Sequence, residues 1–272
     1  MAQRFGIDIS SWQGDFNIKK AVTNEGVQFA ILKIGGGDKV NYKDKTFEAN
    51  YKKCKEAGIP VGVYFFGYAT TMDKAKSEAA YLLQLLAGKQ FEFPIFYDVE
   101  GHMLSATKRT LTDIIKYVMK ELEAHGYWAG IYSSVYAFNN NMYDVELKPY
   151  SHWVASWTKN KPMLNYGGAV QIWQFGGETN KQRSNKINGQ VVDQNYCYVD
   201  YYESVIKQKG LNGYGLSNLP ANQPKKSTRE IALEVIDGKW GNGQERKDRL
   251  TAAGYNYKTV QNMVNKILKE GK

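Results

Sequence analysis

The sequence predicts an α/β fold, an irregular eight-stranded (β/α) barrel followed by a small three-helix bundle. Short apolar runs alternate with amphipathic stretches along the first half of the chain, and this alternation is typical of α/β proteins. The early runs are apolar at nearly every position, as expected for strands that are buried on both faces of a parallel sheet. A stretch rich in Gly, Asn, Pro and Ser then separates residues 228–272 from the rest.

The regular part of the predicted barrel contains five strands and four helices. We expect strands at residues 5–9, 28–34, 61–66, 94–99 and 128–132. A helix follows each of the first four strands, at residues 18–25, 46–57, 73–86 and 107–124. Gly58, Gly88 and Gly126 stand just after three of these helices, where a glycine commonly ends a helix.

The pattern changes after residue 134. Three further strands are expected at residues 152–156, 169–175 and 191–198, but the helices between them shrink or vanish. Eight strands suit a closed barrel that loses its regular helices late.

The domain organisation follows from the break in composition. We expect a barrel over residues 1–208, a linker over 209–227 and a helical module over 228–272. The module holds three short helices, at residues 229–237, 243–253 and 257–268, and Ser227 or Thr228 is expected to cap the first.

The chain is basic, with a net charge of +9. Residues 225–272 hold 11 Lys and Arg against 6 Asp and Glu, so more than half of the excess lies in the last part of the chain. A basic surface attracts nucleic acid, anionic lipid or anionic cell wall, and charge alone does not choose among them. Two cysteines, Cys54 and Cys197, do not make a disulfide framework, although a bridge between them stays open.

The N-terminal segment and the lengths of the apolar runs indicate where the protein is made. The first residues show no basic segment followed by an apolar one, so we expect no signal peptide. No apolar run is long enough for a transmembrane helix. We therefore expect a chain that is made in the cytoplasm and that, if it acts outside, must be released by something else, unless a signal has been removed.

Two carboxylates at the end of the fourth predicted strand are the strongest sign of chemistry. Asp98 and Glu100 are two residues apart, so their side chains point to the same side of the strand, with Cα atoms about 6.5–7 Å apart. The carboxyl ends of barrel strands form the catalytic face. Cleavage of a glycosidic bond needs one carboxylic acid and one carboxylate, and neighbouring carboxylates raise each other's pKa.

Two more acids lie on the first and last predicted strands, which are neighbours in a closed barrel. Asp8 ends the first strand and Asp193 lies on the last, so both are expected to converge with the acid pair on one mouth. Other chemistries fit worse. The three histidines, His102, His125 and His152, lack metal-ligand spacing, and neither a P-loop nor a nucleophile elbow is present.

Several segments together resemble glycoside hydrolase family 25, the lysozyme-type muramidases common among phage endolysins. They are GIDISSWQG at the N-terminus, YFFGYA at 64–69, FYDVE at 96–100, IYSS at 131–134, WVASW at 153–157, IWQF at 172–175 and VDQNY at 192–196. The resemblance covers about residues 4–205. It implies an eight-stranded barrel that cleaves the β-1,4 bond between N-acetylmuramic acid and N-acetylglucosamine in peptidoglycan, without metal or cofactor.

The resemblance also implies roles for individual residues. Glu100 matches the general acid and Asp98 the second carboxylate, which either attacks the sugar or stabilises a cation formed by the substrate's own N-acetyl group. Asp8 and Asp193 match acidic residues of the same groove. The segments that line such a groove contribute further expected substrate-binding residues: Tyr64, Tyr132, Trp157, Trp173 and Gln174.

Residues 229–268 resemble the short helical cell-wall-binding repeat of some phage lysozymes, most clearly in GKWGNGQERKDRLTAAGY at 238–255. The resemblance implies that this module binds the muropeptide, with Trp240 as a platform for a sugar or peptide; the alternative is that Trp240 is core of a small bundle. Such repeats often occur in tandem, whereas this chain shows one copy. A single repeat gives one wall-binding site per chain. We therefore hypothesise that the chain self-associates through this module, which would bring several binding sites together.

Three other functions stay open at this point. The first is a non-catalytic cell-wall-binding protein on the same barrel, although loss of activity would be expected to remove the acid pair. The second is a nucleic-acid binder, for which the chain lacks a groove-reading motif. The third is a hydrolase of another polymer that contains N-acetylglucosamine, such as chitin.

Overall fold

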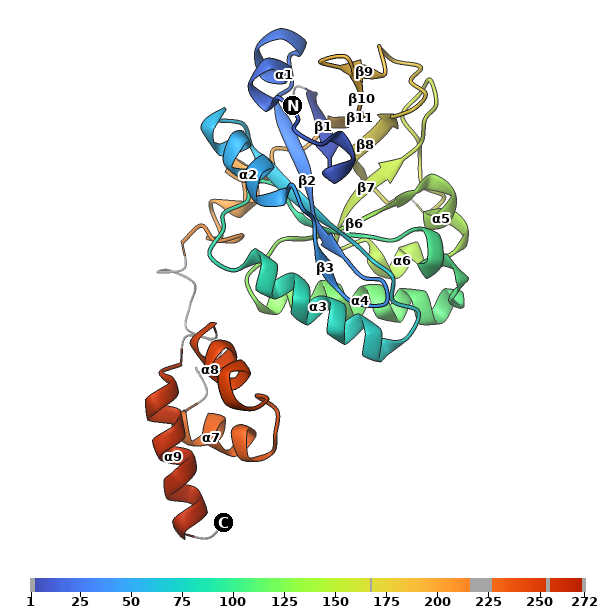
Figure 1. Ribbon diagram of the computed structural model, residues 1–272. Coiled ribbons are helices and arrows are strands. Elements are labelled where there is room, and N and C mark those ends of the chain that lie inside the picture. Colours follow the sequence, from blue (N-terminus) through green and yellow to red (C-terminus); the bar gives the residue numbers. More distant parts are fainter. Residues whose placement is uncertain (1–2, 167, 216–226, 253–254, 271–272) are drawn as a thin grey trace. The chain divides into compact units, whose positions relative to one another are not determined.

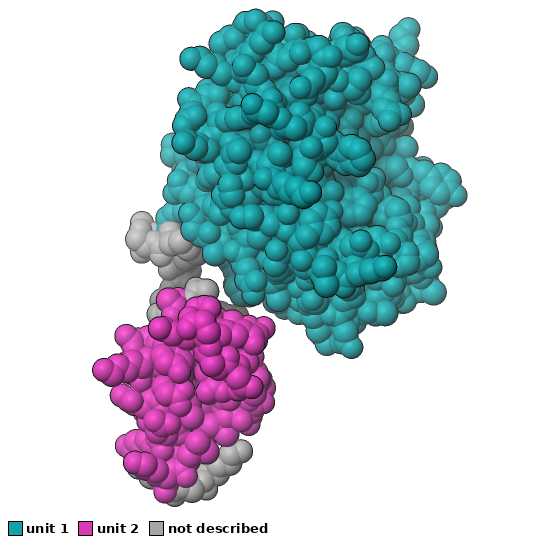
Figure 2. Space-filling view, viewed as in Figure 1, with its two compact units in different colours: residues 1–218 teal, residues 219–272 magenta. Residues whose placement is uncertain are grey.

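The computed structural model describes residues 3–166, 168–215, 227–252 and 255–270. The chain divides into two compact units, residues 1–218 and 219–272 (Figure 2). Buried hydrophobic residues form three clusters: an inner core within the barrel of the first unit, an outer core between its strands and helices, and the core of the second unit.

The first unit is built on a closed barrel of eight strands (Figure 1). Its strands follow the order β1 (Arg4–Ile9), β2 (Phe29–Gly36), β4 (Val61–Phe66), β5 (Ile95–Asp98), β6 (Ala129–Ser134), β7 (Ser151–Ala155), β8 (Val170–Gly176) and β11 (Asp193–Cys197). Neighbours from β1 to β8 pair in parallel, and β11 pairs antiparallel with both β8 and β1. The predicted irregular barrel is confirmed, and the antiparallel last strand is the feature that closes it.

Helices cover the outside of the barrel along its first five strands. They are α1 (Ile18–Glu25), α2 (Phe47–Glu56), α3 (Met72–Leu86), α4 (Lys108–Ala124), α5 (Val135–Asn140) and α6 (Asp144–Leu147). The short remaining elements of this unit are η1 (Ser11–Gln13), β3 (Tyr42–Lys43), η2 (Gly101–Ser105), β9 (Lys186–Ile187), β10 (Gln190–Val191) and the π-helix η3 (Tyr202–Ile206). The loss of long helices after β6 agrees with the sequence pattern.

The inside of the barrel is filled by large aromatic rings that need glycines opposite them. Phe29 and Phe96 lie in the inner core, in which Trp153 is also buried. A Cβ atom at Gly6 would lie 2.4 Å from the Phe29 ring, and one at Gly130 would lie 2.5 Å from the Phe96 ring. These glycines therefore make room for rings that fill the lower part of the barrel, and the site lies above them.

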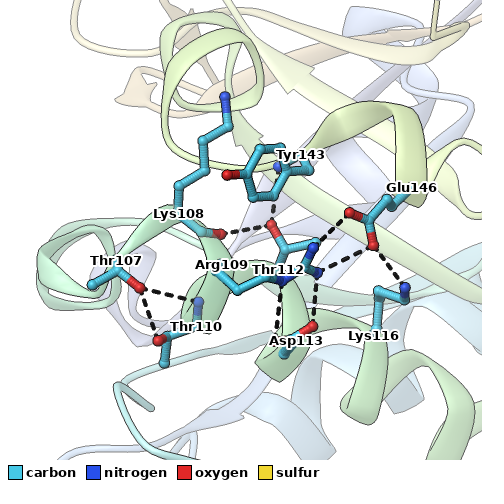
Figure 3. Close-up of polar contacts among 9 residues, drawn as sticks. All are labelled: Thr107, Lys108, Arg109, Thr110, Thr112, Asp113, Lys116, Tyr143 and Glu146. Carbon is cyan, nitrogen blue, oxygen red and sulfur yellow. Dashed lines mark hydrogen bonds and ion pairs between the residues drawn. The ribbon is translucent and has the colours of Figure 1, made fainter.

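The start of α4 is tied to α6 by polar contacts on the surface (Figure 3). Arg109 pairs with Asp113 on its own helix and with Glu146 on α6, and Lys116 also pairs with Glu146 at 2.8 Å. The backbone N–H of Tyr143 donates to the hydroxyl of Thr112. Exposed ion pairs contribute little each, so this network fixes the local geometry more than it stabilises the fold.

The chain after β11 packs back onto the barrel at the opposite end from the site. Residues 209–215, which we expect to begin the linker, belong to this packing, because Asn212 is fully buried there. Its side chain accepts from the backbone N–H of Trp128 at 2.7 Å and donates to the Phe93 carbonyl at 2.8 Å. The rest of the expected linker, residues 216–226, lies outside the described residues.

The second unit is a three-helix bundle of α7 (Thr228–Ile236), α8 (Gly243–Ala252) and α9 (Tyr257–Glu270). Ser227 caps α7 in a capping box with Glu230, as the sequence suggests. Residue 253, the expected last residue of the middle helix, lies outside the described residues. Both cysteines are free and buried, so the bridge left open by the sequence does not form.

Candidate functional site

A cleft of about 470 Å³ opens at the carboxyl ends of the parallel strands. Acids and aromatic rings make up most of its wall. The lining residues are Asp8, Ile9, Ser10, Trp12, Gln13, Lys33, Tyr64, Phe66, Asp98, Glu100, Tyr132, Trp153, Trp157, Gln174, Glu178, Val191 and Asp193.

The predicted acid pair lies in this cleft. Strand β5 ends at Asp98, and Glu100 keeps an extended backbone, with φ −150° and ψ −175°, before the turn of η2 begins. The alternation of the strand therefore continues through Val99, which is buried in the outer core, while the two acids line the cleft. Asp98 is 3% exposed and Glu100 is less covered, so Asp98 lies deeper in the cleft.

Burial raises the pKa of both acids. For Asp98 the pKa lies well above the ordinary aspartate value, because of burial first and the neighbouring Glu100 second, and Lys33 opposes the rise. Burial also raises the pKa of Glu100, again opposed by Lys33. Two interacting carboxyl groups titrate as a pair, so the pair retains one proton at a pH at which isolated carboxyl groups are ionised.

The other two predicted acids face each other across the closing seam of the barrel. Asp8 on β1 and Asp193 on β11 are direct register partners. Because β11 runs antiparallel, the start of that strand reaches the same mouth as the end of β1. Burial raises the pKa of both groups, and the charge of Asp8 raises the pKa of Asp193 further.

Asp8 is held in place by two amide groups. Its Oδ2 accepts from the side chain of Asn195 at 2.7 Å and from that of Gln174 at 3.1 Å. Gln174 in turn accepts from the hydroxyl of Tyr132 and the indole N–H of Trp157. These bonds fix one carboxylate oxygen, so the charge of Asp8 has a defined position in the cleft.

Of the five residues predicted to line the groove, four lie in the cleft and one does not. Tyr64, Tyr132, Trp157 and Gln174 line it. Trp173 instead points to the outer core, where it packs against Phe175 and Tyr196, because it alternates with Gln174 along β8. Trp240 belongs to the separate bundle, where its indole N–H donates to Glu234 and its ring meets Tyr255 edge to face.

Several lining residues were not singled out in the sequence. Trp153 is buried under the cleft, contacts Tyr132 with ring centroids 4.4 Å apart and donates to Asn195 at 2.7 Å. Trp12 lies at the rim and is 90% exposed. Both residues lie in segments that carry the family resemblance, WVASW and GIDISSWQG, so the sequence contained a signal for them. Whether each side chain faces the cleft could be seen only in the structure.

The side chains that line the cleft are mainly carboxylates, amides and aromatic rings. Within the described residues, no group of three or more His, Cys, Asp or Glu side chains is arranged to hold a metal ion, and no helix is long and apolar enough to cross a membrane. An acid pair with raised pKa at the mouth of a barrel, in a cleft walled by aromatic rings, is the arrangement that a glycoside hydrolase needs.

The comparisons name the family. Residues 7–184 match glycosyl hydrolases family 25, and the chain belongs to that family. Residues 229–268 match the CW_7 repeat. Both predicted resemblances are thereby confirmed, and the protein is a glycoside hydrolase of the lysozyme class, a peptidoglycan muramidase with a cell-wall-binding repeat.

Curated relatives are named as lysozymes. The lysozyme of Streptococcus phage Cp-7 is 27% identical over 270 residues, which cover 96% of this chain and 69% of the relative. Lysozyme M1 of Streptomyces globisporus is 46% identical over 61 residues, 22% of this chain and 20% of the relative.

Solved structures agree with the fold. The modular autolysin LytC from Streptococcus pneumoniae, in complex with a synthetic peptidoglycan ligand, is 25% identical with a TM-score of 0.63 over 72% of this chain. The match covers 47% of that autolysin, so the chain spans about half its length. The CTP1L endolysin shares the fold at 18% identity and a TM-score of 0.63, over 98% of this chain and all of that protein.

Proposed function

We propose that this chain cleaves the β-1,4 bond between N-acetylmuramic acid and N-acetylglucosamine, with Glu100 as the general acid and Asp98 as the second carboxylate. The observation that carries the proposal is the placement of the pair. Both side chains leave the same strand end, line the same cleft and have a pKa raised by burial. One shared proton and one negative charge are what glycosidic cleavage needs.

The chemistry follows from the depth of each acid. Glu100, the more accessible acid, donates its proton to the glycosidic oxygen as the bond to C1 of the muramic acid breaks. The N-acetyl oxygen of the same sugar attacks C1, and the carboxylate of Asp98 stabilises the positive charge of the resulting ring. Glu100 then takes a proton from the water that opens this ring, which retains the configuration at C1.

Asp8 and Asp193 complete the acidic wall of the cleft. Asp8 is fixed by two amide donors, and Asp193 lies beside it across the strand seam. We assign both to the stabilisation of the positive charge that develops at C1. Tyr64, Tyr132, Trp157 and Gln174 are assigned to contact with the sugar rings, since flat aromatic faces and amide groups suit sugar binding.

Product analysis tests this function. Purified peptidoglycan is digested, and the new reducing ends are reduced with borohydride and identified by mass. We expect reduced muramic acid ends. Reduced glucosamine ends would mean that the other glycosidic bond is cleaved. No new ends, with wall binding intact, would favour the alternative of a non-catalytic cell-wall-binding protein.

A separate test asks whether the N-acetyl oxygen of the substrate or the carboxylate of Asp98 attacks C1. Rapidly quenched reactions of the wild-type chain are examined by intact-protein mass spectrometry. The substrate-assisted route predicts no covalent glycosyl–protein adduct. An adduct that maps to Asp98 would show direct attack by that carboxylate instead.

For the C-terminal module we propose muropeptide binding, supported by the CW_7 match over residues 229–268. Trp240 has its indole N–H bonded within the bundle, so its role as a platform rests on the ring alone. We further propose that self-association supplies the valency of the single repeat. A monomeric mass by analytical ultracentrifugation, together with full wall affinity at the same concentration, would contradict this.

Access to the wall is proposed to require a holin-type pore, as suggested by the similarity to a phage lysozyme. Expression of the chain in a bacterium with a susceptible wall, with and without a pore-forming protein, tests this. We expect lysis only with the pore. Lysis without it would show another route of export.

A further inference from the structure

The cleft contains one cation that the proposed reaction does not use. Of the lining residues that the structure describes, Lys33 alone carries a positive charge, against five acids: Asp8, Asp98, Glu100, Glu178 and Asp193. None of the ion pairs found among the described residues involves its ammonium group. The group faces the acids without being neutralised by any one of them.

Aromatic rings hold the Lys33 ammonium group in place. Its Nζ lies 4.7 Å from the centre of the Phe66 ring, 5.7 Å from that of Tyr42 and 6.0 Å from that of Tyr64. A ring face attracts a cation without cancelling its charge. The ammonium group is therefore fixed by contacts that leave its field directed into the cleft.

Lys33 points to the inside of the barrel by the ordinary alternation of β2, two residues after Ile31 of the inner core, and the strand becomes irregular just after it. Lys33 pairs with Tyr64 on β4, but Gly35 pairs with the next residue, Phe65, so β2 carries one extra residue at this point. Such bulges redirect side chains and are frequent beside active sites. Gly36 then lies opposite Phe66, and a Cβ atom there would lie 2.8 Å from the Tyr42 hydroxyl and 3.0 Å from Phe66 Cβ.

Building on the proposed roles of the acid pair, we propose that Lys33 is a positioning residue that holds one negative charge on the Asp98–Glu100 pair, so that the pair carries a single proton when substrate binds. Without a nearby cation, five acids in one cleft favour protonation of both members of the pair. The charge of Lys33 opposes the rise in pKa of each member.

The first test measures the carboxyl groups directly and needs no turnover. The full-length chain with ¹³C-labelled Asp and Glu carboxyl groups is titrated by NMR as wild type, Lys33→Gln and Lys33→Arg. Asp98→Asn and Glu100→Gln assign the signals. The other titratable groups that face Lys33 are followed in the same spectra or allowed for: Asp8, Asp193, Glu178, Tyr42, Tyr64 and Tyr132.

We expect both titrations of the pair to move to higher pH in Lys33→Gln, by on the order of one pH unit, as for the loss of a unit charge several ångströms away. Lys33→Arg keeps the charge and is expected to restore the wild-type titration. Titrations that coincide in wild type and Lys33→Gln would overturn the proposal.

Kinetics give a second, independent readout. In Lys33→Gln both limbs of the pH–kcat profile are expected to move to higher pH, with kcat near pH 6 reduced by up to about tenfold and KM little changed. A raised KM with an unchanged kcat profile would show that Lys33 binds an anionic group of the substrate, and would overturn the proposal. A wild-type chain that releases no reducing ends would refute the proposed function, while the NMR titration would still decide the effect of Lys33.

Discussion

Asp98 faces a cleft and yet is almost removed from water, and this places a cost on the folded protein. Its Oδ1 is buried without a hydrogen-bond partner among the described residues. A carboxylate in such a place is poorly solvated, so the folded state favours its protonated form. The acids needed for chemistry are thus expected to reduce the stability of the barrel above acidic pH.

The Asp98→Asn variant is expected to unfold at a higher temperature than wild type at pH 8. Since the folded-state pKa of Asp98 is raised, wild type loses stability as the pH rises from the unfolded-state pKa to the folded-state pKa, and the variant does not. The gain should therefore shrink at pH 4, which thermal unfolding at both pH values measures. Asp113→Asn, at the surface ion pair with Arg109, is the control and should show no such gain.

Glu100→Gln tests the acid itself. The amide keeps the shape but has no acidic proton to donate, so turnover on purified peptidoglycan is expected to fall by at least about 100-fold, the scale of general acid catalysis. Sedimentation with the wall should stay at the wild-type level. Substantial release of reducing ends by this variant would remove Glu100 from the role of acid.

Among the elements, strand β11 most affects the site. Running antiparallel, it pairs with β1 and brings Asp193 opposite Asp8 and Asn195 into contact with it. After this strand, the turn that contains Asn212 covers the opposite end of the barrel with four hydrogen bonds. The backbone N–H of Asn212 donates to Gly126, its carbonyl accepts from Phe91, and its side chain makes the two bonds described above.

Asn212→Ala is expected to lower the free energy of unfolding by about 2–4 kcal/mol, because two buried backbone groups lose their partners. Asn212 has a φ of 52°, so Asn212→Gly separates the effects: it should recover about 1 kcal/mol of backbone strain but not the hydrogen bonds. Asn188→Ala, at a more exposed residue with a φ of 54°, is the control. Urea unfolding measures all three, and equal losses at residues 212 and 188 would contradict the argument.

At the scale of the molecule, the chain has two units with separate cores. We propose that turnover needs only the cleft of the first unit, and that the second unit retains the protein on the wall. A chain that ends at residue 218 is therefore expected to keep its turnover on soluble glycan strands and to lose at least about tenfold in sedimentation with whole walls. Equal sedimentation by both chains would place wall binding in the barrel.

The sequence alone determined the alternation of strands and helices, the change after residue 134 and the acid pair. These features are local: hydrophobic periodicity defines the elements, and the spacing of Asp98 and Glu100 puts both on one side of an extended segment. Motifs shared with family 25 supplied the activity, which the comparisons confirmed.

The tertiary structure decided what depends on contacts between distant segments. It placed Trp173 in the outer core and Trp153 under the cleft, although both lie in quoted motifs, because strand pairing decides which face is inside. It also joined Asp8 to Asn195 and Gln174, and brought Lys33 on β2 into the same cleft as acids on β1, β5 and β11. Burial and charge act through space, so the pKa of each acid follows from residues far away in the sequence.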